Sequence, residues 1–313
     1  MTGTILVLGS SNVDLILPTP RFHDPGETIQ GGNMLRVFGG KGANQAIAAK
    51  RLGGTVRFLT KLGSDSHGDS YFRYLARTGL ERKYLLRDKK LPTGMAFIQW
   101  IPSGENRIIV SPGANSGLSV SDVRKHAGLW KEVSIFITQL ETPFPAMEAA
   151  LRIARRRGVV TIFNPAPAAI LSAKILSLVD FLVPNEVEAQ RLSGIRMKKK
   201  ADLPLVAEKL LRRGSKNVVI TLGGQGSYFR SEGEELRMKA FPVKTVDTTA
   251  AGDAFVGAFA CALAEGKPIK EALRMANGAG ALAATKRGAQ PSLPSLRELE
   301  NFLHRQAGAL PKR

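Results

Sequence analysis

Short runs of aliphatic and β-branched residues alternate along the chain with longer segments whose apolar residues recur at helical spacing. The short runs predict strands over residues 4–8, 56–60, 133–138, 159–163, 181–183 and 218–222. The longer segments predict helices that include residues 43–52, 146–157, 205–213 and 252–264. This alternation is typical of an α/β fold, in which helices cover both faces of a parallel sheet. In such folds ligands bind beyond the carboxyl ends of the strands.

Two stretches interrupt this alternation. Residues 15–36 contain Pro18, Pro20 and Pro25 together with several glycines. Residues 93–111 hold two apolar runs on either side of the turn sequence Pro102-Ser103-Gly104, which is the pattern of a β-hairpin. We expect the two stretches to form a small sheet that lies over the large one as a lid.

The composition is that of a globular protein. Of the 313 residues, 43% are hydrophobic and 23% are charged, so the chain can bury a full core. Its one cysteine, Cys261, excludes an intrachain disulfide and a cysteine-cluster metal site. The longest apolar stretch, residues 254–264, is too short to cross a bilayer, and the first strand begins too early for a signal peptide. We therefore expect a cytoplasmic protein with no membrane segment.

The net charge of +19 favours anionic ligands but does not say which. A nucleic-acid-binding surface usually combines basic residues with aromatic ones. Aromatic residues are only 6% here, and the basic runs at 155–157 and 212–213 come just before Gly158 and Gly214, which end predicted helices. The helix dipole favours cations at such ends, so the runs need no nucleic-acid partner and we expect none.

The segment 246–257 carries small residues into the predicted helix 252–264, with Asp253 in the first turn. Free N–H groups at a helix start can hold an anion, and glycine and alanine let the backbone approach it closely. A carboxylate there could accept a proton from a substrate hydroxyl while the amides hold negative charge. By spacing alone, an ordinary helix-start acid beside packing glycines is the more frequent explanation. No Walker A motif is present, because Lys41 is not followed by Ser or Thr, and no Gly-x-Gly-x-x-Gly fingerprint follows a strand.

Polar residues also follow the first predicted strand. Asn12 and Asp14 alternate and should point to one side of an extended segment. The glycine turn at 38–44, which contains Lys41 and Asn44, leads into the helix 43–52. Carboxylates and amides that converge on one pocket suit a polyhydroxylated ligand, although the same residue types also form ordinary turns.

Other candidates are weaker when taken alone. Glu141 comes after the strand at 133–138, where α/β sites lie. Asn185 and Glu188 follow another strand at the spacing of a helix N-cap and its capping-box partner. The histidines have no metal-ligand spacing; they are His23, His67, His126 and His304.

A series of short motifs runs in a fixed order across nearly the whole chain. In chain order they are Gly9-Ser10-Ser11-Asn12-Val13-Asp14, Pro25-Gly26-Glu27-Thr28, Gly39-Gly40-Lys41-Gly42-Ala43-Asn44-Gln45-Ala46, Gly113-Ala114-Asn115, Gln139-Leu140-Glu141, Asn164-Pro165-Ala166-Pro167-Ala168, Pro184-Asn185-Glu186-Val187-Glu188, Thr221-Leu222-Gly223-Gly224-Gln225-Gly226, the stretch from Asp247 to Asp253, and Gly288-Ala289-Gln290-Pro291-Ser292. Each motif is weak alone, but the ordered series is specific. It resembles the PfkB family of carbohydrate kinases and, within that family, the ribokinases.

The resemblance implies a ribokinase-like three-layer α/β/α sandwich with a mostly parallel central sheet and a small β-sheet lid. It implies a single domain over residues 1–313, with the lid formed by about residues 15–36 and 93–111. The implied reaction transfers the γ-phosphoryl group of ATP to O5 of D-ribose and gives D-ribose 5-phosphate. A kinase for 2-deoxyribose or another small sugar remains an alternative, as does a non-catalytic sugar-binding regulator.

The resemblance also assigns roles to residues. Asp253 matches the catalytic base, and the amides of Ala250, Ala251 and Gly252 match an anion hole for the transferring phosphoryl group. The sugar-binding positions correspond to Asn12, Val13, Asp14, Gly40, Lys41, Gly42, Ala43, Asn44, Glu141 and Asp253. The nucleotide-binding positions correspond to Asn185, Glu188, Thr221, Leu222, Gly223, Gly224, Gln225, Gly226, Gly252 and Asn277. Of these, Asn185 and Glu188 match a motif linked to Mg²⁺ and phosphate through waters.

A monovalent cation and a second subunit are implied in the same way. The family's activating cation is usually K⁺, and its positions correspond to Asp247, Thr249, Ala283, Lys286, Gly288 and Ser292. Several of these ligands would be backbone carbonyls, so side-chain identity says little there. The lid in this family often pairs between subunits, so we expect a homodimer. The motifs do not explain the strongly basic charge.

Overall fold

The computed structural model describes residues 3–308 except Gly104 and Lys198. Within these residues the largest element is a nine-stranded sheet with the order β13-β12-β11-β10-β9-β8-β1-β4-β5. The strands are β1 Thr4–Leu8, β4 Val56–Gly63, β5 Leu85–Asp88, β8 Val133–Thr138, β9 Val160–Phe163, β10 Phe181–Leu182, β11 Asn217–Thr221, β12 Ser227–Arg230 and β13 Glu235–Met238. The strands from β5 to β11 pair in parallel, whereas β12 and β13 at one edge are antiparallel.

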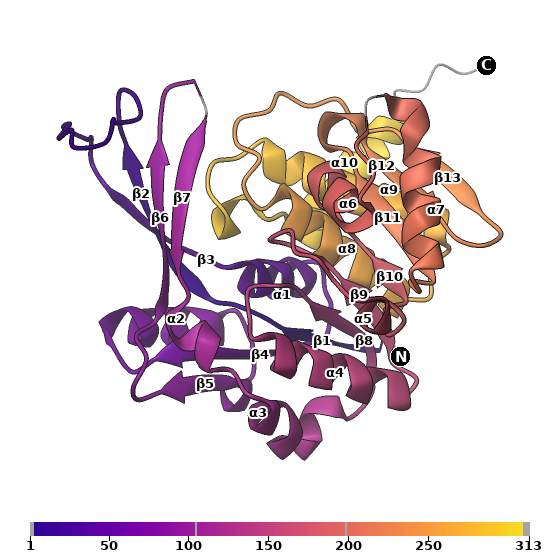
Figure 1. The fold of residues 1–313 in the computed structure, drawn as a ribbon, viewed down its shortest axis with the longest axis horizontal. Helices are drawn as coiled ribbons and strands as arrows, with labels where there is room; N and C mark the ends of the chain where they lie inside the picture. The colour runs from indigo at the N-terminus through magenta and orange to yellow at the C-terminus, as the bar shows by residue number, and fades with distance from the viewer. Residues whose placement is uncertain (1–2, 104, 198, 309–313) are drawn as a thin grey trace.

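Helices cover both faces of this sheet, so the molecule has three layers (Figure 1). The layer that packs on Ile5 and Val7 of β1 contains α1 Lys41–Arg51, α2 Ser66–Arg77, α8 Ala251–Ala264, α9 Ile269–Ala284 and α10 Leu296–Gly308. The layer that packs on Leu6 and Leu8 contains α3 Val120–Lys125, α4 Phe144–Arg156, α5 Ala173–Leu176, α6 Glu186–Ser193 and α7 Leu203–Arg212. Side chains of β1 alternate between the two cores because a strand repeats every two residues. The predicted α/β/α sandwich is therefore confirmed.

The predicted elements lie within a few residues of the observed ones. The helix expected at 252–264 begins one residue earlier in α8, and the strand expected at 56–60 continues to Gly63 in β4. Helix α4 has Arg155 and Arg156 in its last turn, and Gly158 follows in the left-handed region with a φ of 67°. The basic run at this helix end is therefore accounted for by the helix dipole.

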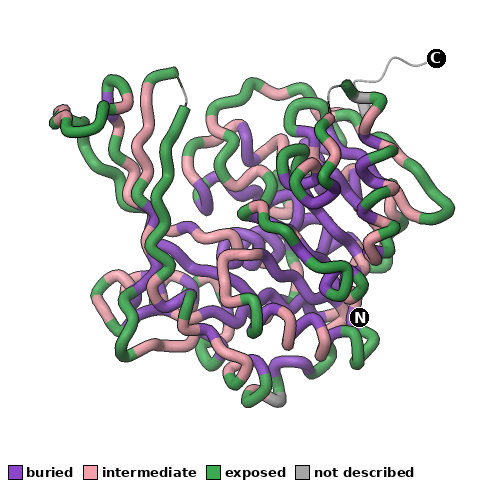
Figure 2. The backbone as a smooth tube through the Cα atoms, in the orientation of Figure 1, coloured by how far each residue is buried: buried purple, intermediate pink, exposed green. Residues whose placement is uncertain are grey.

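A second, smaller sheet stands to one side of the large one (Figure 1). Its strands, in spatial order, are β3 Leu35–Gly39, β2 Asn12–Pro18, β6 Gly94–Trp100 and β7 Asn106–Ser111. The β6–β7 pair is the predicted hairpin, with Phe97 opposite Ile109. Residues 19–34 between β2 and β3 are not in strands, because the prolines in that stretch lack the N–H that a ladder requires. Figure 2 shows that the outer half of this sheet is exposed, in contrast to the buried centre of the large sheet.

Two helix starts meet next to the small sheet because α1 packs closely on α8. A Cβ added at Gly257 of α8 would lie 2.6 Å from the Ala48 Cβ and 2.9 Å from the Ala49 nitrogen of α1. Only glycine allows the two helices to approach so closely. Any larger residue at position 257 would clash with α1 and lower the stability of the fold. The close packing brings the first turn of α8 beside the first turn of α1.

None of the helices in the described part of the chain has both the length and the apolar character needed to cross a bilayer.

Candidate active site

The first turn of α8 carries the central carboxylate of the site. Ala250 precedes the helix in the left-handed region with a φ of 59°, an uncommon conformation for a residue with a side chain. This turn directs the chain abruptly into α8, so that Asp253 lies in the first helical turn and is buried. A Cβ added at Gly252 would meet no atom within 4 Å, which leaves open space before the helix start. Such a start can accept an anion.

Side chains from α1 hold the Asp253 carboxylate on both oxygens. The Asn44 Nδ2 donates to Asp253 Oδ2 at 2.9 Å, and the Gln45 Nε2 donates to Asp253 Oδ1 at 2.9 Å. Burial raises the pKa of Asp253, whereas the nearby Lys41 cation and these two amide donors lower it. The site thus places a basic carboxylate in a nearly dry position and keeps it oriented.

Two further carboxylates face the same space from the small sheet and from the loop after β8. Asp14 lies in β2, and a Cβ added at Gly39 in the neighbouring β3 would lie 2.0 Å from Asp14 Oδ2. Glu141 Oε2 accepts from the Ser10 Oγ at 2.5 Å and from the Lys41 backbone nitrogen at 3.0 Å. Burial, Glu141 and Asp253 together raise the pKa of Asp14 to about 7.

The Lys41 side chain supplies the opposite charge. Burial alone would lower the pKa of Lys41, but the carboxylates of Asp253, Glu141 and Glu188 raise it above its ordinary value. Lys41 therefore stays protonated beside these three acids. This arrangement differs from a P-loop lysine, as its sequence context predicts.

The sugar-side residues named from the sequence come together around this cluster. Asn12 Oδ1 accepts from the Asn115 Nδ2 at 2.7 Å, and Gly40 precedes α1 with a φ of 91°. Gly42 has no room for a side chain, because a Cβ there would lie 2.5 Å from Gly9. Val13 and Ala43 are fully buried in the core, so only their backbone can contribute to the site. All ten residues lie in β2, at the start of α1, after β8 or in α8.

A cavity of about 400 Å³ opens at the start of α8, where Ala251 and Gly252 line it. Of the residues expected at a nucleotide site, its walls contain Asn185, Thr221, Gly223, Gly224, Gly226, Gly252 and Asn277. A Cβ added at Gly223 or Gly224 would meet no atom within 4 Å, so this wall is free of side chains on the cavity side. Three other residues expected there do not line the cavity: Leu222 and Glu188 are buried, and Gln225 is exposed. Apolar walls that the motifs did not indicate come from Phe241, Val243, Phe255 and Ala281.

Asn185 and Glu188 form the capping box that their spacing predicts at the start of α6. The Asn185 Oδ1 accepts from the Glu188 nitrogen at 2.8 Å, and the Glu188 Oε2 accepts from the Asn185 nitrogen at 2.8 Å. Burial raises the pKa of Glu188, and Lys41 opposes this shift. The capping role does not exclude a second one, because the Glu188 charge also acts on the Lys41–Asp253 pair.

The residues expected at a monovalent cation site lie on two loops that Asp247 joins. Asp247 Oδ1 accepts from the Thr249 nitrogen at 2.9 Å, and its Oδ2 accepts from the Gly288 nitrogen at 2.9 Å. Ala283 lies in the last turn of α9, and Ser292 lies in the following 3₁₀ turn. The Lys286 ammonium pairs with Glu298 at 2.7 Å, and since an ammonium group cannot bind a cation, only the backbone carbonyl of Lys286 could serve as a ligand. These loops offer oxygen atoms, which suits a hard cation.

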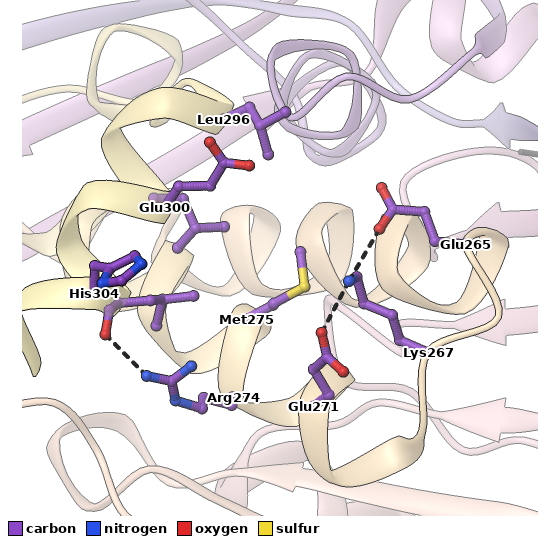
Figure 3. Close-up of a pocket in the computed structure, with 10 residues that line it drawn as sticks. Glu265, Lys267, Glu271, Arg274, Met275, Leu296, Glu300 and His304 are labelled. Atoms are coloured by element: carbon purple, nitrogen blue, oxygen red, sulfur yellow. Dashed lines mark hydrogen bonds and ion pairs between the residues drawn. The ribbon is translucent and has the colours of Figure 1, made fainter. Parts of the chain in front are cut away.

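A second cavity, of about 350 Å³, lies between the end of α8, α9 and α10 (Figure 3). Three of its charged side chains pair with one another. Lys267 pairs with Glu265 at 3.5 Å and with Glu271 at 2.8 Å, and Arg274 donates to the Leu303 carbonyl. It is remote from the carboxylate cluster, because it lies at the opposite end of α8, so we do not assign the chemistry to it.

Several polar contacts in the site were not predicted from the sequence. Ser10, Gln45, Asn115, Gln139 and Asn164 all make side-chain hydrogen bonds within the carboxylate cluster or directly behind it. Each of these residues belongs to one of the quoted motifs. The sequence therefore indicated that they lie near the site, but it did not indicate which residues they contact. The partners are distant in sequence: Gln45 and Asp253, for example, are 208 residues apart.

The raised pKa of Asp14 makes a testable prediction about stability. Its ordinary pKa of 3.8 rises to about 7 on folding, so the folded state keeps a proton that the unfolded chain has lost. This carboxyl therefore lowers stability as the pH rises from about 4 to about 7, by up to about 4 kcal/mol. The Asp14→Asn variant should resist thermal unfolding better than wild type at about pH 8 and lose this advantage at about pH 4.

Asp65 provides a control of opposite sign. Burial would raise its pKa, but hydrogen bonds from Gly68 and Thr93 lower it below its ordinary value. Asp65→Asn should thus be less stable than wild type at about pH 8. An Asp14→Asn variant that is less stable than wild type at this pH would contradict the placement of Asp14 among the carboxylates.

Comparisons with known proteins find relatives that match nearly the whole chain. The family described as pfkB family carbohydrate kinase matches residues 2–296. The ribokinase of Haemophilus influenzae is 42% identical over 303 residues, which are 97% of this chain and 99% of that protein. The deoxyribokinase of Salmonella typhimurium is 33% identical over 300 residues, which are 96% of this chain and 98% of that protein.

A solved structure has the same fold. The ribokinase of Arabidopsis thaliana in complex with ribose and ATP superimposes with a TM-score of 0.88 at 31% identity, covering 97% of this chain and 99% of that one. The family match spans most of the chain, and the H. influenzae relative is well above 30% identical over nearly its full length. The chain therefore belongs to the pfkB family of carbohydrate kinases.

Proposed function

We propose that this protein transfers the γ-phosphoryl group of ATP to O5 of D-ribose and produces D-ribose 5-phosphate. The observation that carries the proposal is the position of Asp253, which belongs to the carboxylate cluster and directly follows Ala251 and Gly252, two residues that line the cavity. A sugar on one side and a nucleotide on the other would meet at this carboxylate. The relatives named above phosphorylate, by their names, ribose or deoxyribose, and the Arabidopsis relative binds ribose and ATP in one structure.

In this proposal Asp253 is the general base. It accepts the proton of the sugar O5 hydroxyl as O5 attacks the γ-phosphorus, and ADP leaves on the opposite side. The raised pKa of a buried carboxylate improves proton acceptance, and positioning within hydrogen-bond reach matters more than strength. Of the amides expected at the anion hole, those of Ala250 and Gly252 would hold the charge on the transferring group, whereas the Ala251 N–H already donates to the Thr248 carbonyl at 3.1 Å.

ATP would occupy the 400 Å³ cavity, where the bare glycine wall at Gly223 and Gly224 suits close approach of a ligand. Mg²⁺, held through waters near Asn185 and Glu188, would neutralise charge on the phosphates. The Glu188 carboxylate fits this role, because it is buried close enough to interact with Lys41 and Asp253. The use of ATP and the buried free thiol of Cys261 fit a cytoplasmic location.

D-Ribose is preferred over 2-deoxyribose as substrate. The H. influenzae ribokinase is the more similar of the two named relatives, at 42% identity against 33% for the deoxyribokinase. On the sugar side, Asn12, Asp14 and Glu141 give several acceptors for hydroxyl groups, and a pocket built to bond a hydroxyl can reject a sugar that lacks it. A 2-deoxyribose kinase remains the alternative, and a non-catalytic regulator is disfavoured by the intact Asp253 site.

The reaction itself can be tested with a panel of sugars. With ATP and Mg²⁺, ADP release should be fastest with D-ribose, slower with 2-deoxyribose and negligible with nucleosides. Asp253→Asn should lower kcat by about a hundredfold or more, because the proton acceptor is lost. Calorimetry should show that this variant still binds ribose.

The exposed Asp69 on α2 gives a matched control, and Asp69→Asn should turn over at the wild-type rate. A higher kcat/KM for 2-deoxyribose than for ribose would overturn the substrate assignment. Turnover near the wild-type rate in Asp253→Asn would overturn the base.

A monovalent cation, with K⁺ as the first choice, would bind between the loops that Asp247 joins. Asp247, Thr249, Ala283, Lys286, Gly288 and Ser292 would hold it, several through backbone carbonyls. The bound ion would order the turn that carries Ala250 without touching substrate.

Replacing K⁺ by the bulky tetramethylammonium ion should lower kcat, and Asp247→Ala should lower it in both salts. Equal wild-type rates in the two salts would argue against the site.

The protein would form a homodimer through the small sheet, which we also infer to act as the lid of a single domain. Phe97 and Ile109 lie opposite each other on the face away from Asp14, and Ile109 is 73% exposed. Apolar side chains on such an edge favour pairing with another sheet.

Ile109→Asp should convert the dimer to a monomer in sedimentation experiments, whereas Ile170→Asp, at an exposed position outside the sheet, should not. A wild-type monomer would contradict the dimer.

A further inference from the structure

Gln45 is fully buried between the catalytic carboxylate and the sheet. Its Nε2 donates to Asp253 Oδ1 at 2.9 Å and to Asn164 Oδ1 at 3.1 Å. Its Oε1 accepts from the Gln139 Nε2 at 2.6 Å. Because a donor holds its oxygen, the Gln45 amide can present only its nitrogen to Asp253. Gln139 lies after β8 and Asn164 after β9, so two strand ends brace one side chain of α1.

The neighbouring Asn44 is held much less firmly. Its Nδ2 donates to the other oxygen of Asp253 at 2.9 Å, but its Oδ1 is buried without a partner among the described residues. A buried acceptor without a partner is costly, so Asn44 is poised to rearrange toward a hydroxyl group. Gln45 has no such freedom, because both ends of its amide are occupied.

We propose that Gln45 is a positioning residue for the Asp253 base: braced by Gln139 and Asn164, it keeps one carboxylate oxygen fixed while Asn44 turns to the substrate. This inference rests on the proposed function, since it assigns the base role to Asp253. The free lone pairs of the carboxylate then stay aimed at the sugar hydroxyl throughout the reaction. A shift of about 1 Å in such a group can cost about a hundredfold in rate.

The charges around Asp253 explain why a neutral donor is needed. Asp14 faces it from β2, Glu141 from the loop after β8, Glu188 from α6 and Lys41 from α1. A second cation at position 45 would make the base too weak, and another acid would add to the repulsion. An amide stabilises the ionised carboxylate by hydrogen bonding and leaves its net charge unchanged.

Substitutions at this position separate positioning from simple packing. Gln45→Leu leaves an apolar side chain that is one atom shorter and removes every hydrogen bond, and we expect kcat to fall about 10- to 100-fold. The affinity for ribose should change less than about threefold, because the sugar contacts are intact. The acid limb of the kcat–pH profile should move up by about half a pH unit or more, since the lost donor no longer favours the ionised form. Gln45→Glu should move the limb further, because it adds a negative charge.

Gln139→Met tests the brace without touching Asp253. It should lower kcat by a smaller factor than Gln45→Leu and leave the pH profile near that of wild type, because the Gln45 donor is retained. Gln306 in the last turn of α10 gives matched controls, and both Gln306→Leu and Gln306→Glu should behave as wild type. If Gln45→Leu fails to fold, Gln45→Glu and Gln139→Met still decide the question.

A titration of the carboxyl group keeps this proposal separate from the proposed reaction. In protein labelled with ¹³C at the aspartate carboxyls, the Asp253 resonance is identified by its loss in Asp253→Asn. Its pKa should rise in Gln45→Leu, whichever sugar the enzyme uses. An unchanged titration together with unchanged kcat would overturn the positioning role. Absence of sugar phosphorylation by wild type, with the titration shifted as expected, would overturn the proposed reaction and leave the contact in place.

Discussion

In the proposed reaction, a buried carboxylate has to remain usable as a base, and this is the constraint on which the rest of the structure depends. Asp253 is removed from water, and burial raises its pKa because it disfavours the charged form. Lys41 and the amides of Asn44 and Gln45 oppose that effect, and all three come from the first turns of α1. The chemistry therefore requires α1 and α8 to keep a fixed relative position.

The fold satisfies this constraint through backbone packing rather than through long side chains. Gly257 lets α8 approach α1 so closely that a single methyl group would clash with Ala48. Both helices pack on the same face of the central sheet, and the strand ends that brace Gln45 belong to that sheet. Rigid elements thus hold each polar contact of the base, which suits a reaction whose rate depends on small displacements.

The carboxylate cluster and the cavity at the α8 start are built differently, in a way that fits the two proposed substrates. The nucleotide side is lined by glycines and apolar walls, where backbone amides can approach phosphate groups. The sugar side collects carboxylates and amides, which can bond several hydroxyl groups. The crowding of acids in the carboxylate cluster raises the pKa of Asp14. The ionised form of Asp14 therefore lowers the stability of the fold, which is the cost of the proposed sugar-binding surface.

The sequence by itself determined the layered α/β architecture, the hairpin of the small sheet and the capping box of α6, because each depends on local periodicity or on residues three apart. It also indicated Asp253, Lys41 and Glu141 as site residues through the ordered motifs. Only the tertiary structure decided which groups touch Asp253, which acid acquires a pKa near 7 and how Asp247 joins two loops. Contacts such as Gln45 with Asp253 join residues far apart in the chain, and burial depends on the packed whole, so no local pattern encodes them.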